Sequence, residues 1–389
     1  MILTLSTGMK RRFLAALEPI RHGRLRLTTP EGIHHFGHDG PEAEMTIHDW
    51  AVLPALLARG DVGFGESWIA GHWHSDDLEA LLTLVLRNLD QFPDYANPRP
   101  LSRLRFLLLD RVLRANSLRG AARNIRAHYD VGNEFYQLWL DPGMSYSSAL
   151  FDGQDSDLER AQRRKNDRIL SRLSPGETVL EIGCGWGGFA ERAADQGRHV
   201  TGLTLSPAQK AYADARLDGR ADIRLQDYRQ VSGRFDNIVS VEMIEAVGER
   251  WWSTYFATLK ARLAEGGQAV LQAITVPDAE FSIYRNRSDF IRQHIFPGGM
   301  LPCNAVMARE AAQAGLTLGD SFSFGQDYGR TCRIWAARME ANRDRIIGLG
   351  YDAAFLRGWM FYLLGCAAAF ATGRTDVVQV ELKHAPAAA

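Results

Sequence analysis

Residues 179–188 read VLEIGCGWGG and join an apolar strand to a turn that contains four glycines. A junction of this kind lets a ligand touch the backbone of an α/β sheet, because glycine has no side chain to occupy the space. We therefore expect a ligand over Gly183 and Gly185. The spacing lacks the Gly-x-Gly-x-x-Gly turn that binds a pyrophosphate. It favours a nucleoside without phosphates, and S-adenosylmethionine is the one we expect.

The segments that follow predict a parallel sheet. Residues 199–206, 223–228 and 235–245 are strand-like runs that end in polar side chains, and stretches long enough for helices separate them. Such runs are typical of parallel strands with crossover helices, and ligands bind at their carboxyl ends. Thr204 stands where most adenosine-binding sheets carry an acid for the ribose. We predict an α/β fold with a Rossmann-like, class I methyltransferase sheet.

Several longer motifs resemble the cyclopropane-fatty-acyl-phospholipid synthase family, to which the mycolic acid cyclopropane and methyl transferases are related. They are IRAHYDVGNEFY at 125–136, LDPGMSYS at 140–147, LQDYR at 225–229, HIFPGG at 294–299, GQDY at 325–328 and FYLLGCAAAF at 361–370. The resemblance implies that S-adenosylmethionine gives a methylene or methyl group to the cis double bond of an unsaturated phospholipid acyl chain. Its implied product is a cyclopropane fatty acyl group.

The resemblance also implies which residues bind the cofactor. The methionine end is expected on Tyr146 and Ser147, above the turn. The ribose and adenine ends are expected on a second group of residues. The full predicted set is Tyr146, Ser147, Glu181, Gly183, Gly185, Gly187, Thr204, Leu205, Gln209, Asp227 and Tyr228. No metal site is expected.

In the enzymes that the chain resembles, a bound bicarbonate takes up the proton, held by a Cys, a Glu, a His, a backbone position beside an Ile, and a Tyr. This sequence keeps Glu245, Ile274 and Tyr328, but Ser148 and Gln272 replace the Cys and the His. Neither replacement can carry a positive charge. Whether bicarbonate is a cofactor therefore stays open, and we expect Glu245 to take over more of the proton removal.

Two further residues belong to the predicted catalytic set. Cys366 lies in an apolar motif and is either a packing cysteine beside the pocket or a catalytic group. His128 is either a pocket residue or a hydrogen-bonding group at the start of a helix, and the resemblance favours the pocket.

The product follows from the carbon that loses its proton. Loss from the new methyl group closes a cyclopropane, and loss from a neighbouring carbon leaves a methyl-branched or methylated trans-alkene chain. A lipid-binding homologue without catalysis is a third interpretation, against which the intact Gln209, Glu245 and Tyr328 argue.

Composition bears on the setting of the protein. The 389 residues carry a formal net charge of −1, which gives no field that would draw the chain to nucleic acid. The four scattered cysteines argue against a disulfide framework and favour a reduced, cytoplasmic protein. The longest apolar run, 359–371, is too short to cross a bilayer, and the first thirty residues resemble neither a signal peptide nor a spanning helix.

Residues 99–126 contain eight arginines and one acid among apolar side chains. Such a segment suits an anionic membrane surface, whereas the alternative is a solvated linker helix. We expect peripheral association with the inner face of the membrane. The expected domains are a lipid-engaging or homodimer-forming unit at 1–92, a basic linker helix at 93–127, and the methyltransferase domain with its acyl-chain pocket at 128–389. An insertion at about 277–304 is expected as a helical lid.

Overall fold

The structure is a computed structural model that describes residues 7–92, 131–287 and 289–386. The basic segment 99–126 and the predicted site residue His128 lie outside the described residues.

A seven-stranded sheet forms the larger part of the fold, with strand order β10-β11-β9-β8-β5-β6-β7. The five strands β9, β8, β5, β6 and β7 run parallel to one another. At the other edge β11 pairs antiparallel with β9, and β10 pairs antiparallel with β11. The strands are β5 (Thr178–Ile182), β6 (His199–Thr204), β7 (Asp222–Leu225), β8 (Phe235–Val241), β9 (Leu263–Thr275), β10 (Leu316–Ser323) and β11 (Asp376–His384). This arrangement confirms the predicted α/β methyltransferase sheet.

Helices connect these strands, as expected for a parallel sheet. They are α9 (Leu158–Ser171), α10 (Gly188–Asp195), α11 (Pro207–Leu217), η2 (Tyr228–Gln230), α12 (Ile244–Val247), η3 (Glu249–Trp251), α13 (Trp252–Arg262) and α15 (Asn304–Gln313). The apolar residues of β5 and β8 are buried because helices cover both faces of the sheet. The carboxyl ends of the parallel strands therefore meet at one edge, which is where ligands bind in such folds.

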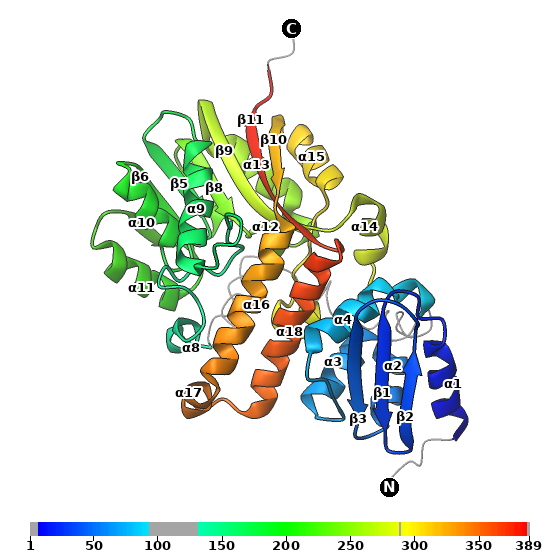
Figure 1. Ribbon diagram of the computed structural model, residues 1–389. Coiled ribbons are helices and arrows are strands. Elements are labelled where there is room, and N and C mark those ends of the chain that lie inside the picture. The colour runs from blue at the N-terminus through cyan, green and yellow to red at the C-terminus, as the bar shows by residue number, and fades with distance from the viewer. Residues whose placement is uncertain (1–6, 93–130, 288, 387–389) are drawn as a thin grey trace.

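The amino-terminal region has a sheet of its own, with order β2-β1-β3-β4 (blue in Figure 1). Its elements are α1 (Thr7–Leu17), β1 (Arg24–Thr29), β2 (Gly32–Phe36), β3 (Glu42–Ile47), α2 (Val52–Arg59), α3 (Asp61–Ile69), β4 (Trp73–His74), α4 (Leu78–Arg87) and η1 (Leu89–Gln91). Alternate residues of β1 and β3 are buried, as expected for a sheet with one face on a core.

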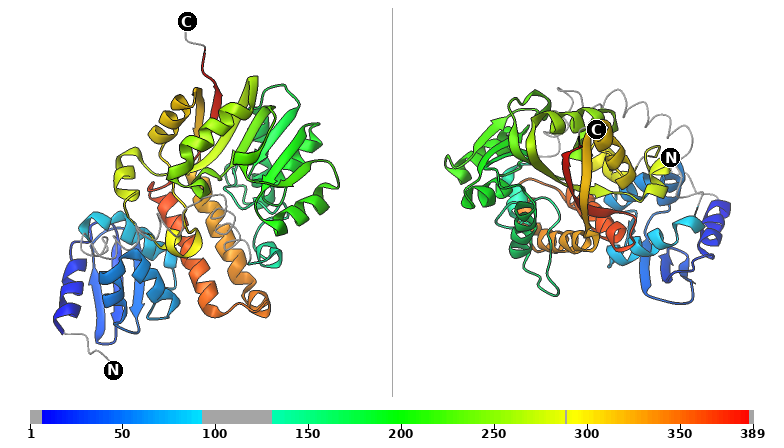
Figure 2. Two further views of the ribbon diagram at one scale, coloured as in Figure 1. Left: turned by 180° about the vertical axis from the view of Figure 1, so that it is seen from behind. Right: turned by 90° about the horizontal axis from the view of Figure 1, so that it is seen from above.

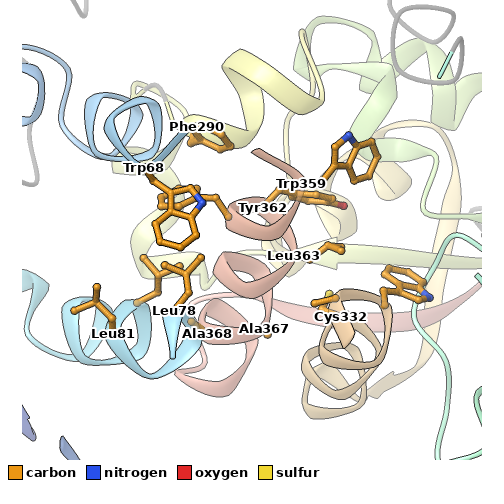
Figure 3. Close-up of a cluster of buried hydrophobic side chains, with 14 of the residues drawn as sticks. Trp68, Leu78, Leu81, Phe290, Cys332, Trp359, Tyr362, Leu363, Ala367 and Ala368 are labelled. Carbon is orange, nitrogen blue, oxygen red and sulfur yellow. The ribbon is translucent and has the colours of Figure 1, made fainter. Parts of the chain in front are cut away.

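Two long helices lie between the two sheets in both orientations of the ribbon (Figures 1 and 2). They are α16 (Gly325–Ala341) and α18 (Ala353–Ala371), joined through α17 (Arg343–Gly348). Trp68 of α3 and Leu78 of α4 lie on one side of α18, and Cys332 of α16 lies on the other (Figure 3). The helix pair therefore joins the amino-terminal sheet to the methyltransferase sheet.

Helix α18 is longer than the apolar run that the sequence indicated. It begins at Ala353, where the Asp352 side chain accepts a hydrogen bond from the Phe355 backbone N–H. Over the described part of the chain it is the one helix whose length and composition would allow it to cross a membrane, and half of that stretch is buried inside the protein. The apolar run 359–371 is therefore the later part of a helix that begins six residues before it.

The predicted insertion folds as α14 (Asp278–Tyr284) and the short π-helical turn η4 (Ile291–Ile295). It is anchored to the amino-terminal region, because the Phe290 N–H donates to the Asp61 carboxylate at 3.0 Å and Arg59 donates to Gln293 at 2.7 Å. Burial raises the pKa of Asp61 to about 7. The short helix α8 (Asn133–Gln137) lies near the amino terminus of α11, where the Asn133 side chain donates to the Ala208 carbonyl.

Candidate active site

A cavity opens at the carboxyl ends of β5, β6 and β8. The loop of residues 144–147, the Lys165 side chain of α9, the glycine turn and the first residues after β8 form its walls. Nine of the eleven predicted cofactor residues line it: Tyr146, Ser147, Glu181, Gly183, Gly185, Thr204, Leu205, Gln209 and Tyr228. The structure thus brings together in one cavity most of a set that spans more than eighty positions of the chain.

Two glycines of the turn have a backbone conformation that residues with a side chain rarely adopt. Gly183 and Gly185 have φ angles of +83° and +53°, in the left-handed region. A Cβ on Gly185 would meet no atom within 4 Å, so this position opens into the cavity. A Cβ on Gly183 would lie 2.4 Å from Cγ of Met243. Gly185 therefore borders open space, whereas Gly183 first makes room for Met243, and the role of both glycines in ligand binding stays a prediction.

The two remaining predicted cofactor residues lie outside the cavity lining. A Cβ on Gly187 would lie 3.2 Å from Ala213 and Leu217, so this glycine allows close packing against α11. The Asp227 carboxylate forms an ion pair with Arg229 at 2.6 Å. The same carboxylate accepts a hydrogen bond from the Arg229 backbone N–H at the start of η2. These contacts of Asp227 lie within its own turn and not in the cavity.

Two buried polar atoms in the cavity wall have no partner among the described residues: Oε2 of Glu181 and the hydroxyl of Tyr228. Burial raises the pKa of Glu181 to about 8, opposed by the positive charge of Lys165. Unpaired buried acceptors and donors cost about 1–3 kcal/mol each, so a bound polar ligand that pairs them is favoured. The positively charged methionine end and the polar groups of S-adenosylmethionine fit these two positions.

Helix α9 supplies a buried cation that the sequence analysis did not identify. Lys165 is 3% exposed, and its Nζ donates to the Ser147 hydroxyl at 3.0 Å. Burial lowers its pKa, and Glu242, Asp141 and Glu181 oppose this shift. The signal in the sequence was the spacing of buried positions on this otherwise polar helix, which places Lys165 on the same face as Leu158, Ala161 and Ile169.

Three of the residues predicted to hold an anion converge on a carboxylate. Oε1 of Glu242 accepts from the Ser148 N–H at 2.8 Å and from Nε2 of Gln272 at 2.7 Å, and its Oε2 accepts from the Tyr328 hydroxyl at 2.6 Å. Ser148 contributes its backbone, because its hydroxyl donates to the Ala149 carbonyl. We call Ser148, Glu242, Gln272 and Tyr328 the carboxylate cluster. Glu242 also lines the cavity, so the cluster borders the cofactor site.

Glu245 lies one helical turn further on, in α12. One of its oxygens accepts from the Ile274 N–H, the backbone position expected from the resemblance, and the other is buried without a partner among the described residues. Burial, together with the charge of Glu242, raises the pKa of Glu245 to about 8. Glu245 is therefore largely protonated at neutral pH.

A chain of side chains fixes the orientation of Gln272. Arg168 donates to Oε1 of Gln379 at 2.6 Å, and Nε2 of Gln379 donates to Oε1 of Gln272 at 2.9 Å. The amide oxygen of Gln272 is thereby occupied, and its nitrogen faces Glu242. A glutamine at this position thus acts as an oriented neutral donor, which a histidine would replace by a titratable group.

Aromatic rings enclose the site on the side of α16 and α18. The Tyr146 and Tyr362 hydroxyls are 2.9 Å apart, and the Tyr328 ring stacks on Phe370 at 4.6 Å between centroids. The rings of Trp139 and Trp335 pack against Tyr146. The wall beyond the cofactor cavity is therefore largely apolar.

Cys366 is a half-buried free cysteine on α18. Its neighbour is Cys332, whose thiol pKa is raised well above the usual value by burial and by a hydrogen bond with Cys366. None of the hydrogen bonds described for the carboxylate cluster involves Cys366. Its catalytic role stays a prediction.

Comparison with known proteins identifies the family. The model of the mycolic acid cyclopropane synthetase family matches residues 116–380, more than half of the chain. The chain belongs to this family. A tuberculostearic acid methyltransferase, UfaA1 of Mycobacterium tuberculosis, is 38% identical across 92% of this chain and 87% of its own length. The cyclopropane-fatty-acyl-phospholipid synthase of Escherichia coli is 34% identical across 87% of each chain.

A solved structure of the family supports the same assignment. The crystal structure of the mycolic acid cyclopropane synthase CmaA1, complexed with SAH and CTAB, is 31% identical and superposes with a TM-score of 0.63. It covers 67% of this chain and 97% of that one. The predicted family, the enzyme class and S-adenosylmethionine as the cofactor are therefore confirmed.

Glu242 was not singled out from the sequence, where only Glu245 matched a residue of the resemblance. Residues 241–245 read VEMIE, and the resemblance pointed to the second acid. The structure ends β8 at Val241, which pairs with Gln272 on β9, so Glu242 is the first residue after the strand and its carboxylate accepts from Gln272. A signal was present, since polar groups that follow a parallel strand lie at the ligand edge of the sheet.

Proposed function

We propose that this enzyme methylates the cis double bond of an unsaturated acyl chain in a membrane phospholipid and leaves a methyl-branched unsaturated chain. The observation that carries the proposal is the carboxylate cluster on the wall of the cofactor cavity. Methylation of an alkene needs no base at the start, but a proton must leave at the end. A site for this reaction therefore needs a cofactor cavity, an apolar enclosure and a proton acceptor, and these three lie together here.

The residues of the chain have separable tasks in this reaction. Glu181 and Lys165, with the loop of residues 144–147, hold the polar end of the cofactor, which supplies an electrophilic methyl group when bound. The aromatic wall excludes water, and ring faces stabilise a neighbouring cation. Alignment of the acyl double bond with the donor is worth up to about 7–11 kcal/mol of the barrier in model reactions.

The name of the Mycobacterium tuberculosis relative specifies methyl transfer, and its similarity extends over most of both chains. This relative supports the branched product over the ring. Ring closure is the second candidate, favoured by the relative from Escherichia coli, which is named a cyclopropane synthase. The two products add the same mass to the acyl chain, so only the presence of a double bond distinguishes them.

The product test is expression in a host whose membrane lipids lack branched and cyclopropane chains. We expect acyl chains that are one CH₂ heavier and that still react with a double-bond reagent before mass spectrometry. Heavier chains that resist the reagent would establish the cyclopropane instead. Unmodified lipids, with S-adenosylmethionine bound normally in calorimetry, would reject both candidates.

The phospholipid substrate implies that the enzyme works at a membrane surface, and we propose that it does so peripherally on the cytoplasmic side. The basic segment 99–126 is the sequence feature that supports this. Replacing Arg103, Arg105 and Arg111 together should weaken binding to anionic vesicles, because each charge near such a surface is worth about 1 kcal/mol. Sedimentation that is insensitive to both salt and this triple substitution would contradict the proposal.

A further inference from the structure

We propose that Glu242 is the catalytic base that removes the proton, so that the chain itself supplies the carboxylate that a bound anion would otherwise provide. This inference rests on the proposed function and names the group that completes its reaction. The carboxylate cluster, the backbone at residue 242 and the contrast with Glu245 support it independently.

The backbone shows that the side chain of Glu242 is held in place. Its φ angle of +52° lies in the left-handed region, which among the described non-glycine residues occurs also at Met144 and Asp218. A glutamate pays roughly 1–2 kcal/mol for this conformation, whereas a glycine does not. Its backbone N–H donates to the Gln272 carbonyl at 2.7 Å, and its carboxylate accepts three more bonds. These contacts fix the carboxylate at the edge of the cavity.

The hydrogen bonds favour the ionised form of Glu242 more than that of Glu245. All three groups that contact its carboxylate are donors, an arrangement that stabilises the charged form. Burial raises the pKa of Glu242, but Tyr328, Ser148, Gln272 and Lys165 all oppose this shift. Glu245 has one donor and an unpaired oxygen, and so it holds the proton. Of these two neighbouring buried acids, Glu242 is thus the one whose contacts favour the charged form.

Glu242 also retains capacity to accept a proton. Each carboxylate oxygen has about two lone-pair sites. Among the described residues, Oε1 accepts two hydrogen bonds and Oε2 accepts one, from Tyr328. One site on Oε2 therefore remains for the incoming proton, on a residue that lines the cavity where the methyl donor binds.

The step balances without a further reactant. When the cofactor is bound, the π electrons of the alkene form a bond to its methyl carbon, the sulfur keeps the electron pair of the broken S–C bond, and the adjacent acyl carbon becomes cationic. Oε2 of Glu242 then forms the new O–H bond with a proton next to the cation. The electron pair of the broken C–H bond closes the double bond or the ring, and Glu242 leaves the cycle as a neutral acid that later loses its proton to water.

This assignment predicts that bicarbonate is dispensable. Ser148, Gln272 and Tyr328, three of the five groups expected to hold it, already donate to Glu242. Glu242→Gly should accommodate the left-handed backbone and free these donors for an external anion. Glu242→Gln keeps the size of the side chain but removes the base.

The experiment compares the wild type, Glu242→Gln, Glu242→Gly and the control Glu249→Gln, which removes a carboxylate seven residues further on that pairs with Arg285. Calorimetry measures S-adenosylmethionine affinity, ¹³C-bicarbonate NMR measures anion binding, and lipid turnover is measured with and without added bicarbonate. We expect Glu242→Gln to lose at least about 100-fold in turnover with cofactor affinity changed less than about threefold, because positioned bases typically contribute 10²–10⁴-fold. We expect wild-type turnover to be independent of bicarbonate, and Glu242→Gly to bind bicarbonate and regain activity with it.

Bicarbonate bound by the wild type with Glu242 in place, or wild-type turnover that stops when bicarbonate is removed, would overturn the inference. So would a Glu242→Gln variant as active as Glu249→Gln. The NMR arm does not depend on turnover. If the wild type modifies no lipid, while only Glu242→Gly binds bicarbonate, the proposed function fails and the placement of the Glu242 carboxylate in the anion site is retained.

Discussion

The two halves of the active site are assembled in different ways. The cofactor half is built mainly from one continuous stretch, in which β5, the glycine turn and the end of β6 lie within about thirty residues. The carboxylate cluster combines Ser148, Glu242, Gln272 and Tyr328 from four distant segments. The geometry of a local turn is set by neighbouring residues of the sequence. The donors of the carboxylate cluster come together only when the whole domain is folded.

The largest effect is expected in the cofactor half. Gly185→Val places a branched side chain in the open cavity and should reduce S-adenosylmethionine affinity on the order of 100-fold or more, at a conformational cost of about 1–2 kcal/mol in stability. Calorimetry and thermal unfolding measure the two effects.

Gly183→Val is the matched comparison, because its side chain meets Met243 before it reaches the ligand. This variant should lose more stability than Gly185→Val for a smaller loss of affinity. If both variants lose the same affinity and have the same stability, the two glycines line the cavity in the same way, as the sequence suggested.

The sequence predicted the fold and most of the cofactor half because both depend on local patterns. Apolar runs separated by helix-length segments specify the parallel sheet, and the glycine spacing specifies the turn. Asp227 and Gly187 are instructive exceptions. Each lies in a motif that the resemblance assigns to the cofactor site. However, the carboxylate of Asp227 is paired with Arg229, and α11 fills the space beside Gly187.

Three members of the carboxylate cluster could be predicted from the sequence, but the fourth, Glu242, could not. The resemblance supplied Ser148, Gln272, Tyr328 and Glu245, but not the residue that three of them contact. Whether Glu242 or Glu245 accepts these hydrogen bonds depends on the residue at which β8 ends and on the left-handed backbone of the next residue. The two glutamates are only three positions apart, so the sequence pattern does not distinguish them. Lys165 was missed for a related reason, since its helix is polar and its burial comes from packing on the loop of residues 144–147.

The next largest effect tests the donor from α16. Tyr328→Phe removes the hydroxyl that donates to Glu242 and should lower turnover by roughly tenfold, the equivalent of a charge-assisted hydrogen bond of about 1.5 kcal/mol. Because this bond lowers the pKa of Glu242, its loss should raise that pKa. Glu242 must be ionised to act, so the acidic limb of the pH–rate profile should move to higher pH.

Tyr362→Phe is the control for this prediction. It removes another buried phenol hydroxyl, which bonds to Tyr146 rather than to Glu242. Its acidic limb should stay where the wild-type limb lies. Identical profiles for both tyrosine variants would show that Tyr328 does not act through Glu242.

A smaller effect is expected from Gln379→Leu. Loss of its amide frees Gln272 to turn its oxygen toward Glu242, and turnover should fall about fivefold, as for loss of a hydrogen bond of about 1 kcal/mol. In a Gln272→Leu background the same substitution should have no further effect on turnover. Additive effects in this double-mutant cycle would show that Gln379 acts by another route.

The smallest effect on turnover is expected from Glu245→Gln, and it separates the two acids directly. The pKa of Glu245 is about 8, so its protonated form predominates at pH 7 and an amide of equal size resembles it. Turnover at pH 7 should therefore fall far less than in Glu242→Gln. Stability should change with a definite sign: the folded wild type keeps this proton up to about pH 8, whereas the unfolded chain loses it near pH 4.5, so wild-type stability falls as pH rises through that window. The variant lacks this penalty, and its unfolding temperature relative to the wild type should rise from pH 5 to pH 8. If Glu245→Gln instead abolishes turnover while Glu242→Gln does not, Glu245 is the proton acceptor that the sequence first suggested, and the carboxylate cluster only positions it.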